Sequence, residues 1–228
     1  MDPAGRWLQE RFGCTIADAA LLLRALTHRS AGPDNNERLE YLGDAALSFV
    51  VAEMLFRRFP EASEGELSRY RASLVSGDAL AALAAEIGLG EQLRLGDGER
   101  KSGGQRRATI LADGLEAVFG AIYLDRGLDA ARAVAGRLFH QSLAALPDAS
   151  ELKDPKTRLQ EWLQGRGFAL PAYTVLEVSG EPHDQRFRVR CDVAELAIAA
   201  EADGSSRRRA EQEAAQRLLD DAALQGRG

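Results

Sequence analysis

The periodicity of apolar residues changes near residue 146, and this change divides the chain into two parts of different architecture. Residues 1–146 are rich in alanine and leucine, are punctuated by glycine and proline, and contain no run that alternates like a strand. The 228 residues suffice for one large or two modest domains, since a domain has about 150 residues. We therefore expect an all-α helical domain at 1–146, a linker at 147–154 and a small α+β domain at 155–225.

The expected elements follow from this reading. In the first part, helices are expected at 3–13, 17–26, 35–58, 63–86, 88–94, 104–125 and 127–145. In the second part, we expect a helix at 155–166, strands at 173–178, 186–193 and 195–202, and a helix at 205–224 with Ser205 or Ser206 as its N-cap. The order of the second part is therefore α-β-β-β-α.

Composition excludes several classes of protein. Two cysteines are too few for a four-thiolate zinc site or a disulfide framework. The three histidines are widely separated and leave little material for a histidine-rich metal centre. The HExxH, CxxC, GxGxxG and GxxxxGKS/T motifs are absent, which argues against zinc proteases, thioredoxin-like proteins, dinucleotide-binding folds and P-loop enzymes.

Charge and hydropathy bear on location and partners. The net charge is −6, with neither part of the chain basic overall, so any site for a polyanion must be a local patch. Residues 1–13 lack the basic and apolar pattern of a signal peptide, and the apolar stretch Ala45–Ala52 is far too short to span a bilayer. We expect a cytoplasmic protein with no membrane association and reduced cysteines.

Acidic residues recur at helical spacing between Asn36 and Asp44. At about 100° per residue, Glu37, Glu40 and Asp44 fall within one ~60° sector of a helix, and no Lys or Arg at i+4 relieves their repulsion. The sector continues with Val51 and Leu55, whereas a purely solvated face would stay polar. A solvated acidic face remains possible, but the pattern favours a site for Mg²⁺ or Mn²⁺, which prefer oxygen ligands.

A second acidic pair lies inside the apolar helix expected at 104–125. Asp113 and Glu116 are i, i+3 neighbours, and acids in such a helix are unfavourable unless they are exposed, paired or bound to metal. Gly43 precedes Asp44, and Gly114 follows Asp113. A glycine inside a helix indicates either the close approach of another backbone or a ligand, or a helix interior that tolerates the unfavourable helix propensity of glycine. Between the two clusters, Ser63 resembles the N-cap of a helix. On spacing alone, Glu64 is an acid in the first turn of that helix, where the helix dipole stabilises negative charge.

Taken together, these motifs resemble the ribonuclease III family in its short bacterial form, with one nuclease domain and one double-stranded RNA-binding domain. The segment 36–44 is similar to the family signature, 26–30 to the segment that precedes it, and 64–68, 101–104 and 110–116 fall where the family has comparable residues. The resemblance implies a metal site of Glu40, Asp44, Asp113 and Glu116 that binds Mg²⁺, with Mn²⁺ able to substitute.

The same resemblance implies roles for individual acids. Asp44 and Glu116 are expected to be the most essential catalytic pair, and Glu37 and Glu64 are expected at the edge of the catalytic valley, near a subunit interface. The resemblance also implies a homodimer formed through the signature helix, in which Val51 and Leu55 would be apolar contacts.

The second part resembles a double-stranded RNA-binding domain. Four polar residues share one face of its first helix: Thr157, Gln160, Glu161 and Gln164. Their side chains could reach the minor groove of an RNA duplex, and a plain solvated face is an equal alternative. His183 lies in the loop 180–183, which is similar to the minor-groove loop of the family. Ser206, Arg207 and Arg208 begin the last helix, where basic side chains and the helix N-terminus suit phosphates, the alternative being a capped helix with a basic surface.

The implied function is an endoribonuclease that hydrolyses double-stranded RNA and leaves 5′-phosphate and 3′-hydroxyl ends with short 3′ overhangs. Its substrates would be precursors of ribosomal RNA, structured messages and transfer RNA precursors, and no organic cofactor is expected. The alternatives are an adaptor that binds duplexes without cutting them, and a phosphohydrolase of small molecules, which would not need residues 151–228.

Overall fold

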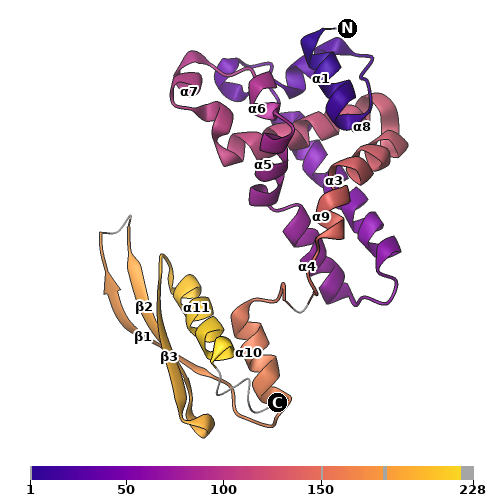
Figure 1. The fold of residues 1–228 in the computed structure, drawn as a ribbon. Helices are drawn as coiled ribbons and strands as arrows, with labels where there is room; N and C mark the ends of the chain where they lie inside the picture. The colour runs from indigo at the N-terminus through magenta and orange to yellow at the C-terminus, as the bar shows by residue number, and fades with distance from the viewer. Residues whose placement is uncertain (1, 150, 182–183, 222–228) are drawn as a thin grey trace. The chain divides into compact units, whose positions relative to one another are not determined.

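The computed structural model describes residues 2–149, 151–181 and 184–221, and it divides into two compact units, Met1–Pro147 and Asp148–Gly228 (Figure 1). The first unit is helical, as the sequence predicts. Its helices are α1 (Pro3–Phe12), α2 (Ala19–Ala25), α3 (Glu37–Arg58), α4 (Glu64–Leu74), α5 (Gly77–Glu86), α6 (Leu89–Gln92), α7 (Asp97–Lys101), α8 (Ala108–Leu138) and α9 (His140–Ala144), with 3-10 turns η1 (Arg29–Ala31) and η2 (Gly104–Arg106).

The core of the first unit is built around α8, which packs most extensively on α3 and α5. Nearly every residue of α8 from 110 to 122 is buried, which explains its apolar composition. Val51 and Leu55 of α3 are fully buried in the same core. The expectation that they are contacts between subunits is therefore wrong. The sector of α3 that carries the acids becomes apolar at these residues because they pack into the core of the same chain.

The structure differs from the expected helices of the first unit at three places. The segment 63–86 forms two helices because the hydroxyl of Ser76 accepts a hydrogen bond from the Ala79 amide and caps a new helix, α5. The short helix α7 was not expected from the sequence. The break expected after residue 125 corresponds to Gly127, whose backbone is non-helical (φ 76°) within the span of α8.

The second unit has the α-β-β-β-α order predicted from the sequence. It consists of α10 (Pro155–Gln164), β1 (Ala172–Ser179), β2 (Arg186–Val193), the 3-10 turn η3 (Ala194–Leu196), β3 (Ile198–Gly204) and α11 (Arg207–Asp220). The sheet is antiparallel in the order β1-β2-β3, and both helices pack on one face of it (Figure 1). Leu159 and Leu163 of α10 meet Cys191 of β2 and Leu218 of α11 in the core.

Two boundaries of the second unit differ from expectation. The third strand begins at Ile198 rather than at residue 195, because residues 194–196 form a 3-10 turn and Ala197 has a left-handed backbone (φ 52°). The N-cap of α11 is Ser206, whose hydroxyl accepts a hydrogen bond from the Arg209 amide. Residues 222–224 of the expected last helix lie outside the described part of the chain. Within the described residues, none of the helices combines the length and the apolar composition that a bilayer span requires.

Candidate active site and RNA-binding surface

Two glycines allow α3 and α8 to approach each other closely. A Cβ atom at Gly43 would lie 1.8 Å from the carbonyl oxygen of Glu116, and a Cβ at Gly120 would lie 2.4 Å from that of Leu39. These distances are far below van der Waals contact, so each position requires glycine. Of the two explanations for Gly43, close approach of another backbone is the correct one, whereas Gly114 faces the side chains of Leu89 and Leu93.

This close approach brings acids of the two helices together. Carboxylate oxygens of Glu40 from α3 and of Asp113 and Glu116 from α8 all lie within 4.8 Å of one another, and all three side chains are half-buried. Asp44 is exposed and stands outside this group of three, one helical turn beyond Glu40. Its charge nevertheless acts on both Glu40 and Glu116.

The electrostatics of the cluster favour a bound cation. Burial, together with the charges of Asp44, Asp113 and Glu40, raises the pKa of Glu116 to about 7. Burial and the nearby Asp113 and Glu37 raise the pKa of Glu40 above its usual value. Burial also raises the pKa of Asp113, although His28 and Arg29 act in the opposite direction. Carboxylates that disfavour each other's charge and supply only oxygen ligands fit a hard divalent cation.

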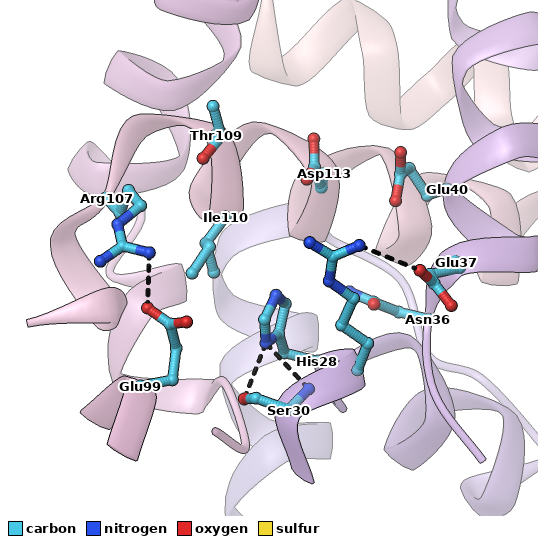
Figure 2. Close-up of a pocket in the computed structure, with 11 residues that line it drawn as sticks. His28, Ser30, Asn36, Glu37, Glu40, Glu99, Arg107, Thr109, Ile110 and Asp113 are labelled. Carbon is cyan, nitrogen blue, oxygen red and sulfur yellow. Dashed lines mark hydrogen bonds and ion pairs between the residues drawn. The ribbon is translucent and has the colours of Figure 1, made fainter. Parts of the chain in front are cut away.

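Two acids of the cluster, Glu40 and Asp113, line a pocket of about 480 Å³ in which acidic and basic side chains lie next to each other (Figure 2). Glu37 and Glu99 line it as well. His28, Arg29 and Arg107 also line the pocket, and Arg29 pairs with Glu37 at 3.6 Å while Arg107 pairs with Glu99 at 2.7 Å. Sequence reasoning gave these basic residues no role, since no periodicity relates residues 28 and 29 to residue 107.

Glu64 is not among the residues that line this pocket within one chain. It is the first residue of α4, where it accepts a hydrogen bond from the Ser68 hydroxyl. Ser63 and Glu66 form a reciprocal capping box at the same helix end. The N-cap expected at Ser63 is therefore confirmed.

The four polar residues expected on one face of α10 are all exposed: Thr157, Gln160, Glu161 and Gln164. Two of them have partners within the unit. The Thr157 hydroxyl donates to Asp154 at 2.8 Å, and Lys153 donates to Glu161 at 2.5 Å. Leu159 and Leu163 point into the core, as the helical periodicity predicts.

The start of α11 carries exposed arginines that differ in their partners. Arg207 donates to Glu211 at 2.8 Å, and Glu211 also accepts from Lys156 of α10 at 2.5 Å. Within the described part of the chain, Arg208 forms no side-chain hydrogen bond to an acid, and its charge acts on Asp154, the N-cap of α10. Arg208 is therefore freer than Arg207 to meet a phosphate. His183 lies outside the described residues.

Comparison with known proteins agrees with this geometry. The model of a family described as Ribonuclease-III-like matches residues 18–143, and that of the double-stranded RNA binding motif matches residues 155–221. Curated relatives named Ribonuclease 3 include one from Alkalilimnicola ehrlichii, 55% identical over 93% of both chains, and one from Vibrio cholerae, 51% identical over 96% of this chain and 98% of its own. The chain belongs to the ribonuclease III family.

Solved structures support the same assignment for the first unit. A nuclease domain of ribonuclease III from Campylobacter jejuni matches with a TM-score of 0.60 and 38% identity, covering 64% of this chain and all of that one. A second structure of a nuclease domain from this organism matches with a TM-score of 0.58 and 40% identity, over 60% of this chain and 97% of that one.

Membership of the ribonuclease III family defines the activity of the chain. It is an endoribonuclease that acts on double-stranded RNA, and the second unit is its RNA-binding domain. Ribonuclease III enzymes are metal-dependent in general, in agreement with the acidic cluster of Glu40, Asp113 and Glu116. The hypothesis of a non-cleaving adaptor is therefore not favoured.

Proposed function

We propose that the chain hydrolyses phosphodiester bonds of double-stranded RNA at the acidic cluster with Mg²⁺, for which Mn²⁺ can substitute. The observation that carries this proposal is the convergence of three half-buried carboxylates from two helices, two of which, Glu40 and Asp113, line the pocket. Glu40, Asp113 and Glu116 would hold the cation, and Asp44 would complete the site from the next turn of α3. A divalent cation in such a site supplies activation of water and neutralisation of phosphate charge.

The acids of this chain have distinct roles in the proposal. Asp44 and Glu116 are the most essential pair on the strength of the family resemblance, and burial together with neighbouring charges raises the pKa of Glu116 to about 7. Glu37 lies at the edge of the same pocket and holds Arg29 there. Glu64 is assigned to the edge of the catalytic valley by family resemblance alone.

RNA binding is proposed for two surfaces of the second unit and one loop. The exposed face of α10 would contact the minor groove, and the start of α11 would contact phosphates through Ser206, Arg207 and Arg208. His183 would contribute from the loop between β1 and β2. Recognition by such a domain rests on the shape of the A-form helix over about 16 base pairs.

The active form is proposed to be a homodimer. Helix α3 exposes large apolar side chains on its outer surface, notably Tyr41 (81% exposed), Phe49 (54%) and Phe56 (70%). A monomer rarely leaves such side chains in water along one helix. The description of one Campylobacter jejuni nuclease domain names a region involved in dimer formation. These side chains, rather than Val51 and Leu55, are the proposed contacts between subunits.

We further propose that the products carry 5′-phosphate and 3′-hydroxyl ends with short 3′ overhangs. The substrates would be precursors of ribosomal RNA, structured messages and transfer RNA precursors in the cytoplasm. The proposed domain boundaries are 1–146 for the nuclease, 147–154 for the linker and 155–225 for the RNA-binding domain.

A gel assay on a long labelled RNA duplex tests the proposal. The duplex is incubated with the full chain in Mg²⁺, in Mn²⁺, in chelator, and in Ca²⁺ as a cation that supports binding. Cleavage in Mg²⁺ and Mn²⁺ but not in chelator is the expected result, with a mobility shift in Ca²⁺. A shift without cleavage in either Mg²⁺ or Mn²⁺ would contradict the proposed chemistry.

A further inference from the structure

His28 is held by η1 and the segment around Gly96 in one orientation. One ring nitrogen, Nδ1, lies 3.2 Å from the backbone nitrogen of Ser30 and 2.8 Å from the Ser30 hydroxyl. The Gly96 amide donates to the same hydroxyl at 2.9 Å, so the proton of that hydroxyl is free to point at His28. Gly96 packs closely here, since a Cβ atom at this position would lie 2.2 Å from the Ser30 carbonyl oxygen.

These contacts fix the tautomer of the neutral ring. A backbone amide can only donate, so Nδ1 must accept the hydrogen bond from Ser30. The proton of the neutral imidazole therefore resides on Nε2, which is a donor. Figure 2 shows this second nitrogen directed away from Ser30 and into the pocket, on the side of Asp113. Among the described residues, none accepts a hydrogen bond from Nε2.

The other nitrogen-rich side chains that line the pocket are occupied differently. Arg29 pairs with Glu37, and Arg107 pairs with Glu99. His28 therefore presents an oriented, uncommitted N–H group beside the acidic cluster, in a pocket whose two arginines are each paired with a carboxylate. Such a donor suits an anionic oxygen, which the nearby carboxylates of Glu40 and Asp113 repel unless a cation is bound.

We propose that His28 is a substrate-contacting residue whose Nε2–H donates a hydrogen bond to a non-bridging phosphate oxygen of the RNA strand, next to the bond that is cut. This inference rests on the proposed function. The hydrogen bond would orient the strand with respect to Glu40, Asp113 and Glu116, so it acts on cleavage more than on affinity of the whole duplex. A hydrogen bond to a charged group corresponds to about a 10- to 100-fold change in rate.

Two substitutions separate this role from a structural one. In His28→Asn, the amide oxygen can replace Nδ1 as acceptor for the Ser30 amide, but no donor reaches the pocket. In His28→Gln, the longer amide can place a donor near the position of Nε2, but the acceptor for Ser30 is displaced. Single-turnover cleavage of an RNA duplex is measured for both variants and the wild type in saturating Mg²⁺, with thermal unfolding of each protein as the folding control.

The expected result is a loss of about 10- to 100-fold in the rate for His28→Asn, with a smaller loss for His28→Gln and an unchanged Mg²⁺ requirement for both. Phosphorothioates are also placed one at a time around the cut bond. At one phosphate, the phosphorothioate should slow cleavage by the wild type but should not slow cleavage by His28→Asn any further. Cleavage by His28→Asn at the wild-type rate would overturn the inference. Equal losses in both variants, or a raised Mg²⁺ requirement at an unchanged maximal rate, would also overturn it. Failure of the wild type itself to cleave would instead contradict the proposed function.

Discussion

The contact between α3 and α8 at Gly43 offers the sharpest test of how this fold brings the acids of its two helices together. In Gly43→Ala the added methyl group would lie 1.8 Å from the Glu116 carbonyl oxygen, whereas ordinary contact begins at 3.4 Å. The helices must therefore separate by roughly 1.6 Å, the difference between these distances. The obstacle is backbone, which cannot rotate away as a flexible side chain can. Since Glu40 precedes Gly43 on α3 and Glu116 is the obstructing residue on α8, this separation acts directly on the acidic cluster.

The magnitude follows from two opposing effects. Overpacking of this kind lies at the upper end of a range of about 1–3 kcal/mol, and replacing glycine by alanine in a helix returns about 1 kcal/mol. The net loss in the free energy of unfolding is therefore about 2 kcal/mol, or a fall in Tm of about 4–8 °C for the nuclease unit. Displacement of catalytic groups by about 1 Å can lower a rate about 100-fold, so cleavage should suffer even where the protein is fully folded.

The assay combines calorimetry with cleavage of an RNA duplex well below the lowest Tm. Gly136→Ala is the matched control, because Gly136 is also in α8 but a Cβ atom there would meet nothing within 4 Å. The control should keep its cleavage rate and gain up to about 1 kcal/mol of stability from helix propensity. A Gly43→Ala protein with the Tm and cleavage rate of the wild type would refute the argument that this glycine sets the distance between the two acidic helices.

Four further predictions concern the acids, the RNA-binding unit and the dimer. Glu116→Gln should abolish cleavage in Mg²⁺ while the mobility shift of an RNA duplex in Ca²⁺ stays at the wild-type level; normal cleavage would exclude Glu116 from the site. Burial alone would raise the pKa of Glu211, but hydrogen bonds and charges of Lys156 and Arg207 lower it below the ordinary 4.5. This carboxylate therefore stabilises the second unit above about pH 4.5, and the stabilisation is lost as the pH falls through the lowered pKa, so acid titration of Tm should be flatter in Glu211→Gln than in the wild type. Arg208→Ala should reduce the salt dependence of RNA binding by about one unit of slope, and Arg207→Ala should have a smaller effect because Glu211 already pairs with Arg207; an equal effect would contradict the difference between them. Phe56→Asp should convert the homodimer to monomers in light scattering, whereas Glu61→Gln on the exposed surface should not.

Much of the fold was accessible from the sequence because periodicity reports burial. The α-β-β-β-α order of the second part, the alternation of 186–193 and the apolar run around Asp113 each correspond to observed elements. The errors arose where a single residue interrupts a pattern. Ser76 ends one apparent helix and begins another by accepting a backbone hydrogen bond, and Ala197 adopts a left-handed backbone that delays the third strand. Periodicity averages over many residues, so it is insensitive to such local features.

Val51 and Leu55 illustrate a different kind of error. The acidic sector of α3 turns apolar, and the sequence alone cannot distinguish a contact with another subunit from burial beneath the same chain. The aromatic residues that α3 exposes, Tyr41 and Phe56, lie outside the sector to which the helical period had drawn attention.

The two-part architecture, the helical placement of the acids and the family of the chain could be read from the sequence, because each depends on residues close together along the chain. Which acids meet became evident in three dimensions. Glu40 and Glu116 are far apart in the sequence, and their distance depends on two glycines that let the backbones of α3 and α8 touch. The orientation of His28 was likewise decided in three dimensions, because Ser30 holds its ring and Gly96, from a separate segment, holds the Ser30 hydroxyl.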